Sequence, residues 1–340
     1  MEACLNHWSF AGLDLRSEES RREFFKPSPG CGCVFGGEGM VSVRIKGEIT
    51  PMGVTDYEPL DWSVVRRVRP GEFHEMLETG GGRGKSVLLD VRNHYESRIG
   101  YFVDGEGREA VRPGIRRFAQ WPGFVRRWVD GDGAGMEGVD GNDEEMGKQG
   151  GRKIMAYCTG GIRCEKATRW MLENAKMKPR DEVYTLEGGI QAYLMWMEEE
   201  IRAGRKTTKD SLFKGKNYVF DARGSLGLDA GHEGDEELEP VAECHVCGQP
   251  EDRLSKCRSR GCHLVLVVCE RCEEGDVRCC ENCRELDREG STEGPRPICL
   301  CEIEREARLW GEEYFRKSKM KGMRKGGKEE GIMIELKAIA

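Results

Sequence analysis

The stretch that most constrains this chain is a cysteine-containing loop between an apolar segment and a helical one. Ile154–Tyr157 is a short apolar run typical of a buried strand, and Glu165–Ala175 has the pattern of a helix. The loop between them reads Cys158-Thr159-Gly160-Gly161-Ile162-Arg163-Cys164. Its two glycines allow backbone N–H groups to turn inward, and the helix adds its positive end. The loop therefore predicts a thiol that ionises readily.

We expect Cys158 to be a catalytic nucleophile and Arg163 to be the cation that favours its thiolate. This arrangement needs no histidine base. Thr159, Gly160, Gly161, Ile162 and Cys164 complete the predicted active-site loop. The alternative, an ordinary buried cysteine at a strand end, does not explain the Gly-Gly pair and the arginine at these offsets. Four residues separate Cys158 from Arg163, one fewer than in cysteine-based phosphatases, so a phosphatase is disfavoured.

Apolar strand patterns alternate with helical patterns from Trp62 onward. The predicted strands are Ser86–Asp90, Ile154–Tyr157 and Val183–Leu186, and an isolated one at Val41–Ile45 precedes them. Predicted helices follow at Phe118–Val129, interrupted at Pro122, and at Gly189–Ala203. The alternation predicts an α/β fold, a doubly wound parallel sheet with helices on both faces. Sites in such folds lie at the carboxyl ends of strands, where Cys158 stands.

Several segments together resemble the rhodanese superfamily. Asp90–Glu96 and Leu186–Ile190 are similar to strand ends of rhodanese domains. The decapeptide Cys158–Ala167, with Met52-Gly53 and Phe213–Asp221, resembles one branch, the oxygen-dependent tRNA uridine hydroxylases, whose eukaryotic relatives are usually described as sulfurtransferase-like. The resemblance covers roughly residues 41–285. It implies a rhodanese-like fold, a reaction at C5 of the wobble uridine, and a supporting role at the active site for Asp90, Arg92 and Glu96.

This sequence departs from the family pattern in its N-terminal domain and at one residue of the rhodanese region. The family opens with a ferredoxin-like domain, of which Gly37–Met40 resembles a remnant, and Tyr101 stands where rhodanese domains often have histidine. The N-terminal domain is therefore expected to be truncated.

The chain is expected to contain five parts. The first is a poorly ordered segment with the ferredoxin-like remnant (1–61), and the second is a rhodanese domain (62–205) with a mobile acidic, glycine-rich insertion (130–151). A linker (206–243), a cysteine-rich zinc module (244–285), and a C-terminal helix with a basic tail (286–340) follow.

The cysteine-rich module is predicted to bind structural zinc. Its cysteines are Cys244, Cys247, Cys257, Cys262, Cys269, Cys272, Cys279, Cys280 and Cys283. Three gaps are Cys-x2-Cys, a spacing that turns two thiolates toward one tetrahedral ion. Eight of the nine would fill two closed four-cysteine sites, holding about two zinc ions. His245 or His263 are possible substitute ligands, and Cys299 and Cys301 are left unassigned. Disulfides would need an oxidising compartment.

Composition restricts the partners of this chain. No apolar run approaches the roughly 20 residues of a membrane span, and the first residues lack a secretory signal, so we expect a cytoplasmic protein. The net charge of −7 argues against an overall surface that coats nucleic acid, and no DNA partner is expected, but the charge is unevenly distributed. The charge reverses near the C-terminus, where a basic tail is a candidate RNA contact. Its residues are Arg316, Lys317, Lys319, Lys321, Arg324, Lys325 and Lys328.

Three functions fit these features. The first is C5 hydroxylation of the wobble uridine in a tRNA anticodon stem-loop. The second is a sulfurtransferase that takes sulfane sulfur from a small donor such as thiosulfate. In that case a Cys158 persulfide is held by loop amides and Arg163, with Cys164 as a resolving thiol. The third is a non-catalytic, zinc-stabilised interaction module. An intact Cys158 argues against the third, because binding-only rhodanese domains commonly lose this residue.

Overall fold

The computed structural model describes residues 48–54, 57–58, 60–61, 63–80, 86–130, 151–220, 223–228, 239–288 and 298–310, together with residues 17 and 20. Four expectations concern residues outside these ranges: the strand Val41–Ile45, the remnant Gly37–Met40, nearly all of the acidic insertion, and the basic tail after Phe315. Among the described residues, no helix is long and apolar enough to cross a membrane.

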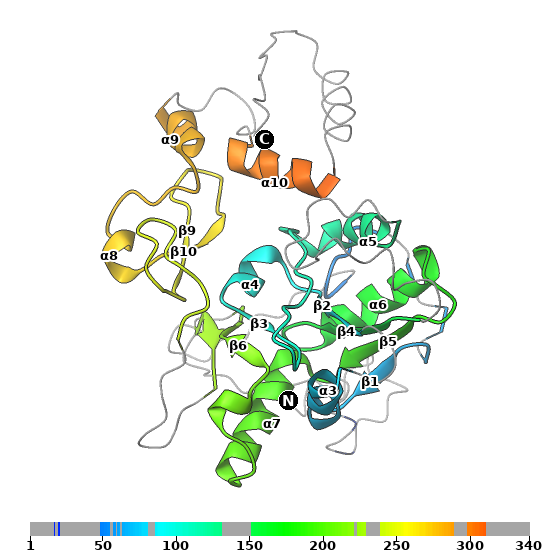
Figure 1. The fold of residues 1–340 in the computed structure, drawn as a ribbon. Coiled ribbons are helices and arrows are strands. Elements are labelled where there is room, and N and C mark those ends of the chain that lie inside the picture. Colours follow the sequence, from blue (N-terminus) through cyan, green and yellow to red (C-terminus); the bar gives the residue numbers. More distant parts are fainter. Residues whose placement is uncertain are drawn as a thin grey trace.

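The centre of the fold is a four-stranded parallel sheet with strand order β1-β5-β4-β2 (Figure 1). Its strands are β1 (Arg66–Val68), β2 (Ser86–Asp90), β4 (Lys153–Tyr157) and β5 (Glu182–Leu186). The three strands predicted within this region are confirmed as β2, β4 and β5. β1 has no apolar pattern, because Arg66 and Arg67 are exposed and only Val68 is buried, so the sequence did not indicate it.

Helices cover both faces of the sheet, as predicted for a doubly wound fold (Figure 1). One face carries α5 (Trp121–Asp130) and α6 (Ile162–Asn174), and the other carries α3 (Pro70–Glu78) and α7 (Gly189–Arg202). Side chains of β4 alternate between the two cores: Ile154 packs in the cluster that contains Trp170, and Met155 in the cluster that contains Tyr193. A strand buried on both faces explains the continuous apolar run in the sequence.

The predicted interruption at Pro122 is wrong. A single 3-10 turn, Phe118–Gln120, precedes α5, which begins at Trp121. Pro122 therefore lies in the first turn of the helix, where its missing N–H leaves no intrahelical bond unmade.

Smaller strands extend the rhodanese region beyond the sheet. β3 (Gly100–Phe102) pairs antiparallel with β6 (Phe213–Gly215), and β7 (Asn217–Tyr218) pairs with β8 (Ser225–Leu226). α4 (His94–Arg98) precedes β3. The segment expected to be a linker thus contains three of these strands, and Phe213 is buried in the same core cluster as Tyr193.

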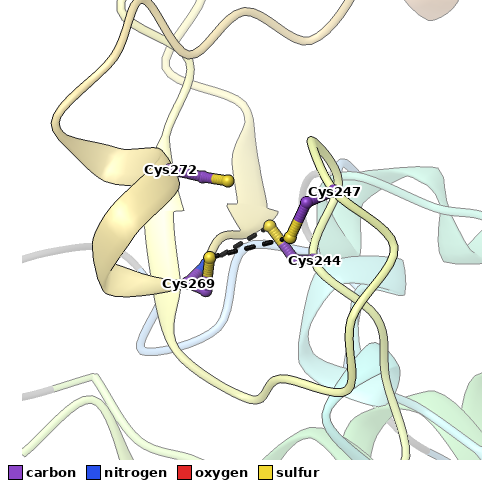
Figure 2. A group of neighbouring side chains, drawn as sticks. All are labelled: Cys244, Cys247, Cys269 and Cys272. Carbon is purple, nitrogen blue, oxygen red and sulfur yellow. Dashed lines mark hydrogen bonds between the residues drawn. The ribbon is translucent and has the colours of Figure 1, made fainter.

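The cysteine-rich region has its own small core, formed largely by cysteines. Its elements are β9 (Leu254–Lys256), β10 (Val265–Val267), α8 (Glu270–Glu273), α9 (Glu281–Arg288) and α10 (Leu300–Trp310). Figure 2 shows four of its cysteines pointing toward one another, two of them from the α8 turn. α10 also reaches the rhodanese region, where Leu309 joins the α5/α6 core and Trp310 packs against Gly123.

Candidate active site and metal centres

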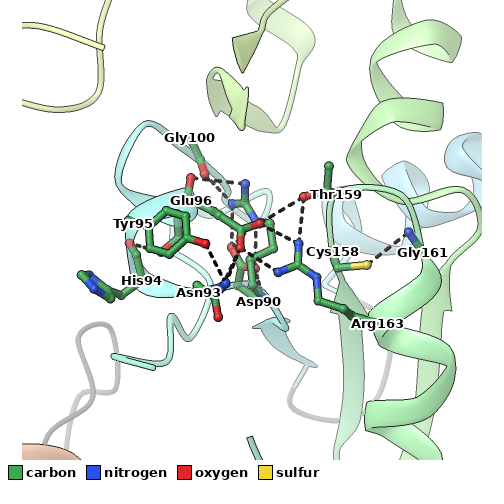
Figure 3. A network of polar contacts seen from close by, with 12 residues as sticks. Asp90, Asn93, His94, Tyr95, Glu96, Gly100, Cys158, Thr159, Gly161 and Arg163 are labelled. Carbon is green, nitrogen blue, oxygen red and sulfur yellow. Dashed lines mark hydrogen bonds and ion pairs between the residues drawn. The ribbon is translucent and has the colours of Figure 1, made fainter. Parts of the chain in front are cut away.

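Cys158 follows the last residue of β4, and its loop curls back over the sulfur. Gly161 has φ 84°, in the left-handed region that favours glycine, and serves as the N-cap of α6. Its N–H donates a hydrogen bond to Cys158 Sγ over 3.1 Å (Figure 3). The Cys158 side chain is buried. An added Cβ at Gly160 would meet no atom within 4 Å, so the loop has open space at this position.

A second glycine pair supports the loop from the β5–α7 turn. Gly188 and Gly189 have φ values of 68° and 65°. The N–H of Ile190, just after them, donates to the Cys158 carbonyl oxygen over 3.0 Å. A Cβ atom at Gly189 would press on that carbonyl and lie 2.7 Å from the Gly161 nitrogen. The approach of the two turns therefore requires glycine at position 189.

We expect Gly189→Ala to lower the free energy of unfolding by about 2–4 kcal/mol, through backbone strain and the clash with the loop. Gly204→Ala is the matched control, since Gly204 also has a positive φ (71°) but no atom would lie within 4 Å of its Cβ. The control should lose only about 1 kcal/mol. Denaturant unfolding of both variants measures the difference; equal losses would contradict the close packing of the two turns.

The environment of Cys158 favours its thiolate. Burial opposes ionisation, but a hydrogen bond from the Cys164 thiol, the charge of Arg163 and backbone N–H groups outweigh it and lower the pKa of Cys158 to about 6. The pKa of Cys164 shifts in the opposite direction, because burial and the hydrogen bond to Cys158 raise it well above the ordinary value. At neutral pH, Cys158 is thus mainly thiolate and Cys164 is a neutral donor.

This contrast predicts a pH profile. Because the thiolate is the reactive form, the rate at which iodoacetamide alkylates Cys158 should rise through a midpoint near pH 6. Peptide mass spectrometry can follow Cys158 and Cys164 separately in the same sample. Cys164 should stay unreactive throughout neutral pH. A Cys158 midpoint above pH 8 would contradict the thiolate assignment.

Arg163 is held by a buried carboxylate. Its Nη1 and Nη2 atoms donate to the two oxygens of Glu96 over 2.7 and 2.6 Å, and Nη2 also donates to Thr159 Oγ1 over 3.0 Å (Figure 3). Glu96 is fixed at the start of α4, where its carboxylate accepts a hydrogen bond from the Asn93 backbone N–H over 3.2 Å. Arg163 therefore lies between the Cys158 loop and Glu96, which compensates part of its charge.

Asp90 and Arg92 form a second buried ion pair behind the first. Arg92 Nη2 donates to Asp90 Oδ2 over 2.7 Å and to the Gly100 carbonyl over 2.6 Å. The pair ties the end of β2 to the start of β3, on either side of the helix that carries Glu96. Of the three supporting residues expected from the resemblance, Asp90 and Arg92 thus precede α4 and Glu96 lies within it. Among these three, only Glu96 hydrogen-bonds to Arg163 or to Thr159.

An aromatic group that the sequence pattern did not indicate lies beside Arg163. The Phe220 ring is 66% exposed, and its centroid lies 5.8 Å from the Arg163 guanidinium carbon. Tyr218 packs edge-on against Phe220, and Tyr95 against Tyr218, with centroid distances of 4.9 and 5.4 Å. Phe213–Asp221 carried part of the family resemblance, which was the only signal for this group.

The cysteine-rich region contains three groups of four cysteines that could bind metal ions. These groups are Cys244/Cys247/Cys269/Cys272 (Figure 2), Cys257/Cys262/Cys279/Cys283 and Cys279/Cys280/Cys299/Cys301. Within each group all sulfur atoms lie within 4.8 Å of one another, and no disulfide joins any cysteine of the described ranges. Four thiolates about 2.3 Å from a tetrahedral zinc ion would be about 3.8 Å apart, and the Cys247–Cys269 distance is 3.8 Å. The residues fit structural zinc.

The grouping differs from the expectation in three respects. Cys299 and Cys301, unassigned from the sequence, belong to the third group. Cys280 and Cys283 were expected to face one ion, but they lie in different groups, because Cys279, Cys299 and Cys301 complete the Cys280 group. Neither His245 nor His263, the possible substitute ligands, joins a group in the described parts of the chain. His245 Nε2 instead lies 3.0 Å from the Arg278 carbonyl oxygen.

Comparisons with known proteins agree with this architecture. The sequence model of the family described as "Rhodanase C-terminal" matches residues 214–284. The tRNA uridine(34) hydroxylase of Chlamydia pneumoniae is 30% identical over 271 residues, which cover 77% of this chain and 69% of that protein. This chain belongs to the tRNA uridine(34) hydroxylase family of rhodanese-domain proteins. The resemblance inferred from the sequence is confirmed.

Two further relatives show how much of each known protein this chain covers. The tRNA uridine(34) hydroxylase of Chlamydia abortus is 31% identical over 251 residues, 71% of this chain and 63% of that protein. "Rhodanese-like domain-containing protein 6" of Arabidopsis thaliana is 34% identical over 225 residues, 65% of this chain but 32% of that protein. The chain therefore spans about a third of the plant relative and less than two thirds of the Chlamydia abortus relative.

Proposed function

We propose that this chain modifies the wobble uridine of tRNA at C5, with Cys158 as the nucleophile. The observation that carries the proposal is the exposed Phe220 ring, whose centroid lies 5.8 Å from the guanidinium carbon of Arg163. Arg163 is one of the groups that lower the pKa of Cys158 to about 6. Proteins that read single-stranded RNA loops stack unpaired bases on aromatic rings. A uracil stacked on the free face of Phe220 would therefore bind at the edge of the site that contains Arg163 and Cys158.

The other site residues take positioning roles in this proposal. The Gly161 N–H and the start of α6 hold negative charge at the sulfur. Glu96 orients Arg163, and the Asp90–Arg92 pair fixes α4, which carries Glu96. The basic tail after Phe315 would supply a local concentration of positive charge for the RNA backbone in a chain whose net charge is −7. Zinc in the cysteine groups would be structural, since sulfur-only sites leave no open position.

Sulfur transfer is the second candidate, and the low pKa of Cys158 favours it as well. A thiolate in a ring of N–H donors is suited to attack a sulfane donor and hold the resulting persulfide. Cys164 is a poor resolving thiol in this scheme, because its raised pKa keeps it protonated. The acceptor would therefore have to come from outside the loop.

Replacing Phe220 with Ala should weaken binding of an anticodon stem-loop with an unpaired wobble uridine by about 10-fold, since stacking contributes about 1–3 kcal/mol per base. Fluorescence anisotropy of a labelled stem-loop measures it. Phe220→Trp should retain binding, and Met195→Ala, on the exposed surface of α7, is the matched control.

The same variants separate the two candidate reactions. Thiosulfate is a small anion that needs only the Cys158 loop, so Phe220→Ala should leave its turnover unchanged. If the wild-type chain binds no stem-loop yet turns over thiosulfate rapidly, the sulfurtransferase function replaces the proposed one. Unchanged stem-loop binding by Phe220→Ala would remove the stacking role.

A further inference from the structure

The second and third cysteine groups share one residue, Cys279. Its sulfur lies within 4.0 Å of five other sulfurs. The distances from Cys279 Sγ are 3.7 Å to Cys262, 4.0 Å to Cys280, 3.2 Å to Cys283, 3.7 Å to Cys299 and 3.5 Å to Cys301.

This number of neighbours is too large for a single metal ion. In one tetrahedral site each sulfur has three sulfur neighbours, about 3.8 Å away. A sulfur shared by two tetrahedra has six. Cys279 has five within 4.0 Å, and Cys257, whose sulfur accepts the Cys279 N–H over 3.4 Å, is the remaining member of its two groups.

We propose that seven cysteines hold two zinc ions bridged by the Cys279 thiolate, so that the chain binds three zinc ions rather than two. The seven are Cys257, Cys262, Cys279, Cys280, Cys283, Cys299 and Cys301. Two four-coordinate ions need eight sulfur positions, and seven thiolates supply them when one thiolate serves both ions. A single ion would leave three of these crowded thiols without a role. The third ion belongs to the separate Cys244 group.

Metal binding at the bridged cluster would also fix the position of α10 against the rhodanese region. Cys299 and Cys301 lie at the start of α10, and the far end of that helix buries Leu309 in the α5/α6 core. Between these ends, Arg305 donates to the Gly114 carbonyl and Gln120 Nε2 donates to Glu306 Oε1 over 3.2 Å. Metal binding at the near end therefore fixes a helix that packs on the catalytic domain.

Metal counting tests the stoichiometry. The full chain, purified under reducing conditions with zinc present, should contain about three zinc ions by elemental analysis. The double variant Cys299→Ser/Cys301→Ser should contain about two. Cys31→Ser/Cys33→Ser is the matched control, because it removes another Cys-x-Cys pair, and should keep three. Two zinc ions in the wild-type chain, with Cys299 and Cys301 reactive toward thiol reagents, would overturn the proposal.

A second measurement on the wild-type chain tests the bridge itself and does not depend on any variant folding. Replacing zinc with cadmium-113 should give three NMR resonances in the four-sulfur region. Two of them should be split by coupling to each other through the shared Cys279 sulfur, and the third, from the Cys244 group, should stay unsplit. Three unsplit resonances would show separate ions and exclude the bridge. Neither measurement depends on the proposed RNA reaction.

Discussion

Glu96→Ala is expected to lower the free energy of unfolding by about 3–5 kcal/mol, because it leaves the Arg163 guanidinium buried without its carboxylate. In the native structure Arg163 makes two hydrogen bonds to Glu96, and both side chains are buried. Chemical denaturation monitored by tryptophan fluorescence gives the loss, since Trp121 and Trp170 lie in the adjoining core.

The control for this prediction is an ion pair of similar geometry on the surface. Glu200 and Arg205 are joined by two hydrogen bonds of 2.7 and 2.8 Å, but Arg205 is largely exposed. Solvent screens such pairs, so Glu200→Ala should change stability little. A loss from Glu96→Ala no larger than that from Glu200→Ala would show that the buried pair does not stabilise the site.

Cys158→Ser is expected to reduce tRNA modification by on the order of 10³-fold or more, because a serine hydroxyl in this loop has no base to remove its proton. The substitution is nearly isosteric, so the fold should persist. Product formed per hour on unmodified tRNA, measured by nucleoside mass spectrometry, gives the ratio.

Cys164→Ser separates the two cysteines. A serine at 164 can still donate a hydrogen bond to the Cys158 sulfur, so we expect a loss below about 10-fold. If Cys164→Ser were as inactive as Cys158→Ser, Cys164 would take part in the chemistry itself, which would contradict its role as a neutral hydrogen-bond donor.

The sequence was sufficient for the parts of the fold that depend on local pattern. β2, β4 and β5 are buried runs of apolar residues, and the glycines around Cys158 mark a turn that only glycine adopts easily. β1 escaped prediction because two of its three residues are exposed arginines. Pro122 was misjudged because a proline inside a helical pattern and one in its first turn look alike until the helix start is known.

Contacts between distant residues could not be derived from pattern alone. Glu96 and Arg163 are 67 residues apart, and they meet because β2 lies next to β4 in the sheet. The sequence pointed to Glu96 only through family resemblance. The cysteine groups show the same limit, since Cys-x2-Cys spacing did not reveal that Cys280 and Cys283 lie in different groups or that Cys299 and Cys301 complete one of them.

The most direct test of the central claim is nucleoside mass spectrometry of tRNA from cells that lack their own wobble-uridine hydroxylase. The cells would express either the full chain or its Cys158→Ser variant, with equal amounts of zinc-loaded protein verified in both. We predict uridine hydroxylated at C5 in tRNA from cells with the wild-type chain and none from cells with Cys158→Ser. Unmodified wobble uridine with the wild-type chain, or equal modification by both chains, would contradict the account.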